Sequence, residues 1–100
     1  MEKFIYYNDL YLIYKDLINI KNQEIFDLYY GENLSMQEIA DIKKISKSRV
    51  GLVIKNVEKK LDYYESILKI KNRNTELNNI LEINDITEIK SRISEILKGE

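Results

Sequence analysis

Several residue types are absent or scarce in this chain, and each absence limits its structure and its chemistry. Its 100 residues include no proline and only three glycines, so few positions interrupt a helix. Cysteine and histidine are both missing, which excludes disulfides, thiolate nucleophiles and histidine general bases, and removes most zinc sites. We therefore expect a protein that is not an enzyme and that uses no metal or other cofactor.

Long apolar runs are also lacking. No apolar stretch approaches the roughly 20 residues of a membrane-spanning helix, and residues 1–9 are too polar for a signal peptide. Hydrophobic residues make up 44% of the chain and charged residues 33%, a balance typical of a globular protein. We expect a single all-helical, cytoplasmic domain over residues 1–100 with no membrane partner. Its core should span residues 6–71, and a C-terminal segment at 75–98 should serve packing or dimerisation.

Apolar periodicity predicts the first two helices. Isoleucine and tyrosine are abundant and would suit strands, but they recur every three to four residues, as on a helix. We expect the first helix over Tyr6–Ile20, with Asn8 or Asp9 near its N-terminal cap. The second should start after Asn22 and end at Gly31, because glycine tolerates the left-handed conformation of a C-terminal cap.

The stretch from Leu34 to Leu61 predicts a short helix, a tight turn and a longer helix. Ser35 can cap the first of these helices, with Glu38 completing a capping box, and Ser46 can cap the second. The apolar residues of the longer helix recur at helical spacing: Val50, Val53, Ile54, Val57 and Leu61. This arrangement is typical of a helix-turn-helix, whose second helix can lie in the major groove of DNA. A generic pair of packed helices is the alternative.

Basic residues gather in this same stretch, although the net charge of the whole chain is -1. Between Lys43 and Lys60 the only acidic residue is Glu58. Lysines on a solvated face often serve solubility alone, so the cluster also has this simpler explanation. The candidate nucleic-acid-binding residues are Lys43, Lys44, Lys47, Ser48, Arg49, Leu52 and Lys55.

The joint spacing of several short motifs resembles that of one known family. Asp27-Leu28-Tyr29-Tyr30 precedes Leu34-Ser35 and Glu38-Ile39-Ala40-Asp41, and these are followed by Ser46, Val50, Ile54, Glu58, Lys59, Leu61 and Tyr64. From about Tyr11 to Leu68 this pattern is similar to the YlxM family of small bacterial helix-turn-helix proteins, which resemble the fourth region of sigma-70 factors. The resemblance implies an all-helical, dimeric protein with a role beside the signal recognition particle.

Two positions depart from the family pattern. Lys44 stands in the turn where glycine or asparagine is common, and it is less suited to a left-handed conformation. Gly51 replaces the usual aromatic residue, at a cost of about 1 kcal/mol in helix propensity. The residues expected to face a groove are Lys47, Ser48, Gly51, Leu52 and Lys55. None of them is an arginine, asparagine or glutamine, so we expect phosphate contacts rather than bidentate reading of bases.

Two side chains in this region each have two roles open. Arg49 can reach either a backbone phosphate or Asp41 of the preceding helix. Leu52 can contact either a thymine methyl group or a protein partner. The packing of the two helices decides which neighbours each side chain has.

The second helix of the motif meets no breaker, and its apolar period continues to about Lys71. Asn72-Arg73-Asn74-Thr75 is predicted as a connector, Thr75 can cap a short helix, and Asp85 with Glu88 predicts a capping box for the last helix. The candidate dimer or partner surface consists of Tyr64, Leu68, Ile86, Ile89, Ile93 and Ile96. The isoleucine stripe of the last helix could instead pack within one chain, and both arrangements can hold in a dimer.

Two functional hypotheses follow. The first is a DNA-binding regulator, a homodimer that sets two Ser46-capped helices against a duplex, where avidity strengthens weak contacts. The second is a protein or RNA accessory factor of the signal recognition particle that does not read DNA sequence. Its lysines would meet RNA phosphates or an acidic protein surface. A preference among DNA sequences that is lost on Lys47→Ala and Lys55→Ala distinguishes the first from the second.

Overall fold

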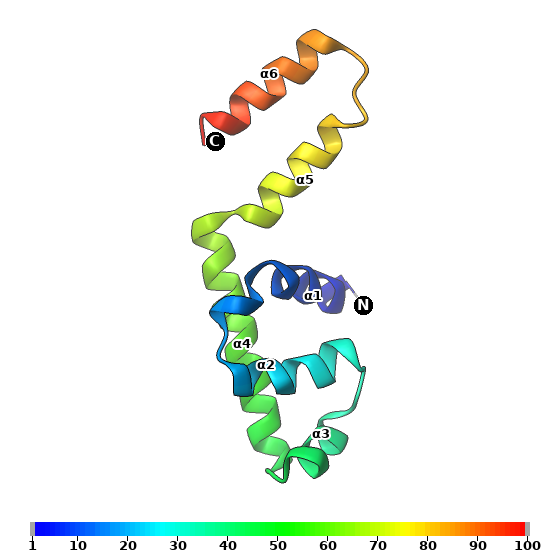
Figure 1. Cartoon of the computed structure of the whole chain (residues 1–100), viewed down its shortest axis with the longest axis vertical. Coiled ribbons are helices and arrows are strands. Elements are labelled where there is room, and N and C mark those ends of the chain that lie inside the picture. Colours follow the sequence, from blue (N-terminus) through cyan, green and yellow to red (C-terminus); the bar gives the residue numbers. More distant parts are fainter. Residues whose placement is uncertain (1, 100) are drawn as a thin grey trace. The chain divides into compact units, whose positions relative to one another are not determined.

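A computed structural model describes residues 2–99 of the chain. Within this range the regular elements are all helical (Figure 1), which confirms the predicted all-α fold with a helix-turn-helix, an extended second helix and C-terminal helices. The elements are α1 (Glu2–Tyr14), the 3-10 turn η1 (Lys15–Leu17), α2 (Ile20–Phe26), the π-helical η2 (Asp27–Gly31), α3 (Met36–Lys43), α4 (Lys47–Leu68), α5 (Ile70–Ile80) and α6 (Ile86–Leu97). The chain divides into two compact units, Met1–Ile67 and Leu68–Glu100.

The core of the first unit is formed by one buried stripe of α4 and the helices before it. The largest wholly buried side chains come from all four of these helices: Leu10, Phe26, Ile39, Val50, Val57 and Leu61. Each such burial contributes about 1.5–3 kcal/mol. Because the α4 members recur at three- to four-residue spacing, the opposite face of that helix remains in solvent.

An aromatic stack extends this core. The Tyr30 ring stacks on Phe4 at a centroid distance of 4.4 Å and on Phe26 at 4.3 Å. Tyr11 tilts against Phe26 at 4.7 Å, and Tyr29 meets Tyr30 edge-on at 5.2 Å. Aromatic pairs contribute about 0.5–1.5 kcal/mol beyond the area they bury. The stack therefore joins α1, α2 and η2.

Tyrosine hydroxyls connect the N-terminal part of the first unit to α4. Three of them donate to carboxylates of α4: Tyr7 to Asp62 (2.7 Å), Tyr14 to Glu65 (2.6 Å) and Tyr30 to Glu58 (2.6 Å). Hydrogen bonds to a charged acceptor are stronger than neutral ones. The bond to Asp62, and then burial, raises the pKa of Tyr7, whereas burial, and then the bond to Glu58, raises the pKa of Tyr30.

The first helix lies further toward the N-terminus than the sequence predicts. α1 begins at Glu2, whose charge favours the N-terminal end of a helix, and it ends at Tyr14. The predicted range Tyr6–Ile20 is therefore wrong at both ends. Asn8 and Asp9 lie inside the helix rather than at its cap.

A side chain from α2 explains the early end of α1. The Gln23 amide donates to the carbonyl oxygens of Lys15 and Ile18 over 2.8 and 2.7 Å. These bonds satisfy carbonyl groups that a continued helix would bond internally. The chain can therefore turn through η1 and enter α2. The spacing of apolar residues does not predict this turn, because the turn depends on the Gln23 side chain.

Two asparagines set the ends of the second helical segment. Asn19 has an extended backbone, and its side chain accepts a hydrogen bond from the N–H of Asn22 over 2.9 Å. α2 thus begins at Ile20, and the prediction of a start after Asn22 is wrong. The prediction of a left-handed cap at Gly31 is also wrong, because Asn33 adopts the positive φ of 57° instead. Asparagine tolerates this conformation better than most residues.

The helix-turn-helix has the caps that the sequence predicts. Ser35 Oγ accepts from the N–H of Glu38 over 3.1 Å, and the Glu38 carboxylate accepts from the N–H of Ser35 over 3.0 Å. The backbone bond, and then the hydroxyl of Ser35, lowers the pKa of Glu38. Ser46 Oγ accepts from the N–H of Arg49 over 3.0 Å. Between the two caps Lys44 adopts the left-handed conformation, with φ 58° and ψ 44°.

The long helix ends earlier than its apolar period predicts. α4 stops at Leu68, and Lys69 takes a left-handed φ of 52° before α5 begins. The predicted connector 72–75 lies inside α5, where the Thr75 hydroxyl donates to the carbonyl of Lys71 over 3.0 Å instead of capping a helix. The predicted helix end at about Lys71 and the predicted connector at 72–75 are therefore both wrong. Polar residues can occupy an exposed helical face, so residues 72–75 remain helical, and the backbone turns at Lys69 instead.

The cap of α6 is where the sequence predicts it. Asp85 accepts a hydrogen bond from the N–H of Thr87 over 3.2 Å. Glu88, which was expected to complete a capping box, accepts from Arg92 over 3.3 Å, one helical turn further along the same helix. The helix start is therefore confirmed, with a side-chain ion pair at Glu88.

The second unit is a pair of helices, α5 and α6, with a very small core. Among its described residues Ile80 is the one buried hydrophobic side chain, whereas Leu81 and Leu97 are each 82% exposed. So little buried area gives a two-helix unit little hydrophobic stabilisation.

Candidate nucleic-acid interface

One face of α4 carries most of the predicted contact residues. The Ser46 cap fixes where the helix starts, and Val50, Val53 and Ile54 bury its other face in the core. The predicted residues exposed on α4 are Lys47, Ser48, Arg49, Leu52 and Lys55. Positions three to four residues apart are neighbours on a helix, so Ser48, Leu52 and Lys55 form one rigid surface. Leu52 is 51% exposed on this surface.

Lys43 differs from the other predicted lysines because it has a partner on α2. Its Nζ donates to Glu24 Oε1 over 2.7 Å, and its side chain is 29% exposed. This bond and the charge of Lys43 lower the pKa of Glu24. A phosphate would have to compete with Glu24 for Lys43. Lys44, in the turn, is exposed and makes no ion pair within residues 2–99.

Arg49 makes no bond to Asp41 within the described part of the chain. The Asp41 carboxylate instead accepts from the Gln37 amide over 3.1 Å, within α3. The Arg49 side chain is exposed at the start of α4. Of its two predicted roles, the contact with a phosphate is the one that this geometry leaves open.

An open groove of about 460 Å³ borders the exposed face of α4. Its lining comes from α1, η2, α3 and α4, all in the first unit: Lys3, Tyr29, Met36, Ser48, Gly51, Leu52, Ile54, Lys55 and Glu58. Gly51 leaves its floor without a side chain, and a Cβ there would meet Met36 Sδ at 3.5 Å. The groove thus brings together four of the five residues that were expected to face a nucleic-acid groove.

Three residues of this groove lie outside α4 and were missed by reasoning from the sequence. Lys3, Tyr29 and Met36 come from segments that precede the basic cluster along the chain. No short motif links them to α4, and only the packing of α1, η2 and α3 brings them beside it. The one available signal was the family motif at Asp27-Leu28-Tyr29-Tyr30, which marks a tyrosine without giving its role.

The predicted partner surface divides between the two units. In the first unit Tyr64 is half-buried, and its hydroxyl donates to the carbonyl of Leu17 over 3.4 Å. In the second unit Leu68 is 50% exposed, Ile86 68% and Ile93 39%. Ile89 and Ile96 of the same stripe are half-buried.

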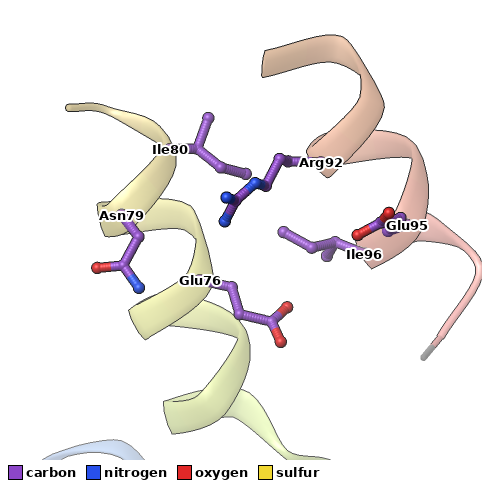
Figure 2. A pocket seen from close by; sticks show the side chains of 6 residues that line it. All are labelled: Glu76, Asn79, Ile80, Arg92, Glu95 and Ile96. Carbon is purple, nitrogen blue, oxygen red and sulfur yellow. The ribbon is translucent and has the colours of Figure 1, made fainter. Parts of the chain in front are cut away.

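A second hollow, of about 200 Å³, lies between α5 and α6. It is lined by Glu76, Asn79, Ile80, Arg92, Glu95 and Ile96. Figure 2 shows the Arg92 guanidinium reaching from α6 toward α5, with Ile96 beside it. Arg92 is already paired with Glu88, and the hollow is small. The hollow therefore reflects loose packing between the two helices and is not a ligand-binding site.

Within residues 2–99 no helix has both the length and the apolarity to cross a bilayer. The same residues contain no group of three or more His, Cys, Asp or Glu side chains placed to hold a metal ion.

Comparison with known proteins gives a consistent set of relatives. The model of the UPF0122 family, described as "Putative helix-turn-helix protein, YlxM / p13 like", matches residues 1–99. A UPF0122 protein of Ureaplasma parvum serovar 3 is 34% identical over 87 residues, which cover 87% of this chain and 88% of the relative. One of Mycoplasma capricolum is 37% identical over 91 residues, covering 88% and 80%. One of Thermoanaerobacter sp. strain X514 is 33% identical over 81 residues, covering 81% and 69%.

Proposed function

This chain belongs to the UPF0122 family of YlxM- and p13-like helix-turn-helix proteins, and from that premise we propose that it is a cytoplasmic, non-enzymatic regulator that binds nucleic acid. The exposed face of α4 meets the phosphate backbone. The single observation that carries the proposal is the display of Lys47, Ser48 and Lys55 on a helix whose start is capped and whose opposite face is buried.

The chemistry of this face favours phosphates over base edges. Lysine ammonium and serine hydroxyl groups bind phosphate oxygens. Arginine, asparagine and glutamine make the bidentate contacts that distinguish bases, and none of the residues expected to face a groove, Lys47, Ser48, Gly51, Leu52 and Lys55, is of these types. We therefore expect duplex DNA to bind with modest sequence preference and with a strong dependence on salt.

The test is fluorescence anisotropy of a labelled random DNA duplex in a salt series. The double variant Lys47→Ala, Lys55→Ala should bind more weakly, and the slope of log K against log salt should become shallower by about two, because each phosphate contact adds about 0.9 to it. Lys90→Ala, Lys98→Ala removes two exposed lysines at or just beyond α6 and is the matched control. An equal loss in both double variants would contradict the proposal.

We also propose that the active form is a homodimer joined through the second unit. The support is the exposed apolar stripe of α6, where Ile86 is 68% exposed, together with the small core of this unit. A dimer would cover these residues and set two α4 helices against one duplex, so that weak contacts add in one complex.

Sedimentation equilibrium tests the dimer. The wild-type chain should sediment with twice the mass of one chain, and Ile86→Glu, Ile93→Glu should sediment as a monomer. Ile20→Glu is the matched control, because Ile20, at the start of α2 in the first unit, is also 68% exposed. A monomeric wild type at micromolar concentration would contradict this proposal.

A second candidate function is favoured by Leu52. This side chain is 51% exposed beside Lys55, so it can contact an apolar group of a protein or ribonucleoprotein while Lys55 meets an acidic group. The protein would then be an accessory factor of the signal recognition particle, as the resemblance to the YlxM family implies, and its lysines would bind RNA phosphates. In the anisotropy experiment, displacement of DNA by the particle's RNA at salt concentrations that abolish DNA binding would favour this candidate over the DNA regulator.

A further inference from the structure

The groove beside α4 is concave, whereas reading of duplex DNA by a helix needs a convex surface that enters the major groove. Its volume is about 460 Å³, and it is open to solvent rather than enclosed. A concave site of this kind receives a group that projects from its partner. The bases of an intact duplex do not project, but an unpaired nucleotide of a folded RNA does.

The lining of the groove suits a nucleobase. Tyr29 supplies an aromatic ring, whose packing against Phe4 at 6.3 Å and Tyr30 at 5.2 Å limits its movement. Bases stack on such rings with little dependence on sequence. The thioether of Met36 is polarisable and adapts to flat groups, and Gly51 leaves open the space that a side chain would occupy.

The charges at the groove suit the phosphates on either side of a base. Lys3 comes from α1 with its side chain 74% exposed and its Nζ 4.0 Å from Glu58 Oε1, and Lys55 comes from the exposed face of α4. The one acidic lining residue, Glu58, is only 13% exposed and already accepts a hydrogen bond from Tyr30 over 2.6 Å. Two lysines against one carboxylate leave the lining of the groove with a net positive charge.

We propose that this groove binds a single unpaired nucleotide of an RNA bulge or loop, with its base against Tyr29, Met36 and Gly51 and its neighbouring phosphates on Lys3 and Lys55. The inference rests on the proposed nucleic-acid binding and adds to it the class of ligand. Ser48 and Glu58 are the polar side chains of the lining that could hydrogen-bond to the edge of a base, and Glu58 already accepts a hydrogen bond from Tyr30. The site therefore distinguishes unpaired from paired nucleotides more strongly than it distinguishes one base from another.

The test compares two labelled RNA duplexes that differ only by one bulged nucleotide. The bulged RNA should bind about tenfold more tightly than the paired RNA, the effect of stacking one base on an aromatic ring. Tyr29→Leu should reduce this ratio to near one. Tyr63→Leu is the matched control, because Tyr63 is 62% exposed and lies outside the groove, and it should leave the ratio unchanged.

A second variant, Gly51→Leu, tests the same groove in case Tyr29→Leu does not fold. Gly51→Leu should also abolish the preference, because its side chain fills the groove, and leucine favours a helix. Helicity measured by circular dichroism verifies that both variants fold. With 2-aminopurine as the bulged base, stacking on Tyr29 should quench its fluorescence in the wild type and not in Tyr29→Leu.

The outcomes separate this inference from the proposed function. Equal, salt-dependent binding of bulged and paired RNA would overturn the inference and leave the proposed function standing. No binding of any RNA or DNA at low salt would overturn both. An equal preference for the same bulge in a DNA duplex would overturn the assignment to RNA, and competition by an acidic peptide but not by bulged RNA would assign the groove to a protein.

Discussion

Lys43 Nζ lies 2.7 Å from Glu24 Oε1, and this contact joins the end of α3 to α2. A lysine that the basic cluster marks as a phosphate ligand is thus held by a carboxylate of its own chain. Both side chains are partly exposed, at 29% and 49%, so a phosphate can reach Lys43 once Glu24 releases it. In the proposed complex, Glu24 would compete with a phosphate for Lys43.

Removing this competitor should strengthen binding. We expect Glu24→Gln to raise the affinity for duplex DNA about two- to fivefold at low salt, the range of a surface ion pair, and to make the salt slope steeper by about 0.9. Anisotropy across a salt series measures both quantities. Glu88→Gln, which breaks the Arg92 pair on α6, is the control and should change neither. A weaker complex with Glu24→Gln would show that the pair positions Lys43 instead.

The bond between Tyr30 and Glu58 should matter for stability. Tyr30→Phe leaves a carboxylate that is only 13% exposed without its 2.6 Å donor, so the free energy of unfolding should fall by about 1–3 kcal/mol. Tyr29→Phe removes a hydroxyl that makes no hydrogen bond within residues 2–99, and it should cost less than about 0.5 kcal/mol. Urea denaturation of the two variants measures the difference. Equal losses would contradict this reading of the bond.

Stability should fall in alkaline solution. The pKa values of Tyr7, Tyr11 and Tyr30 are raised in the folded protein, by the Asp62 bond foremost for Tyr7 and by burial foremost for the other two. The unfolded chain releases these protons near pH 10 while the folded chain keeps them. The stabilisation is therefore complete below about pH 10 and is lost as the pH rises toward the folded pKa values.

Urea titrations between pH 8 and pH 11 measure this effect. The wild type should keep its stability to about pH 9 and lose it above about pH 10. Tyr30→Phe should show a shallower decline, because one of the raised groups is gone, whereas Tyr63→Phe should decline like the wild type. A constant stability from pH 9 to pH 11 would contradict the prediction.

The left-handed turn at Lys44 offers a stabilising change. With φ at 58°, Lys44 holds a conformation that strains a residue with a Cβ, so Lys44→Gly should stabilise the fold by about 0.5–1 kcal/mol. Lys44→Ala removes the same charge and keeps the strain, so it should give no such gain. Thermal unfolding followed by circular dichroism distinguishes the two. Equal melting temperatures would mean that the turn is not strained.

Much of the fold follows from local chemistry that the sequence displays. The capping box at Ser35 and the cap at Ser46 need only residues within the same turn, so both are where the sequence predicts them. The buried stripe of α4 follows from helical spacing for the same reason. The predictions fail where the deciding partner is distant along the chain, as with Gln23 at the end of α1, or where one residue alone turns the backbone, as at Lys69.

The sequence by itself determined that this protein is helical, that it contains a helix-turn-helix and that a cluster of basic residues runs through the turn and the second helix of that motif. Periodicity, capping and charge are local properties, and they act before the chain packs. Only the tertiary structure decided that Glu24 holds Lys43, and that Lys3, Tyr29 and Met36 join the exposed face of α4 in one groove. These are contacts between separate helices, and they depend on how the buried faces fit together, which no local pattern encodes.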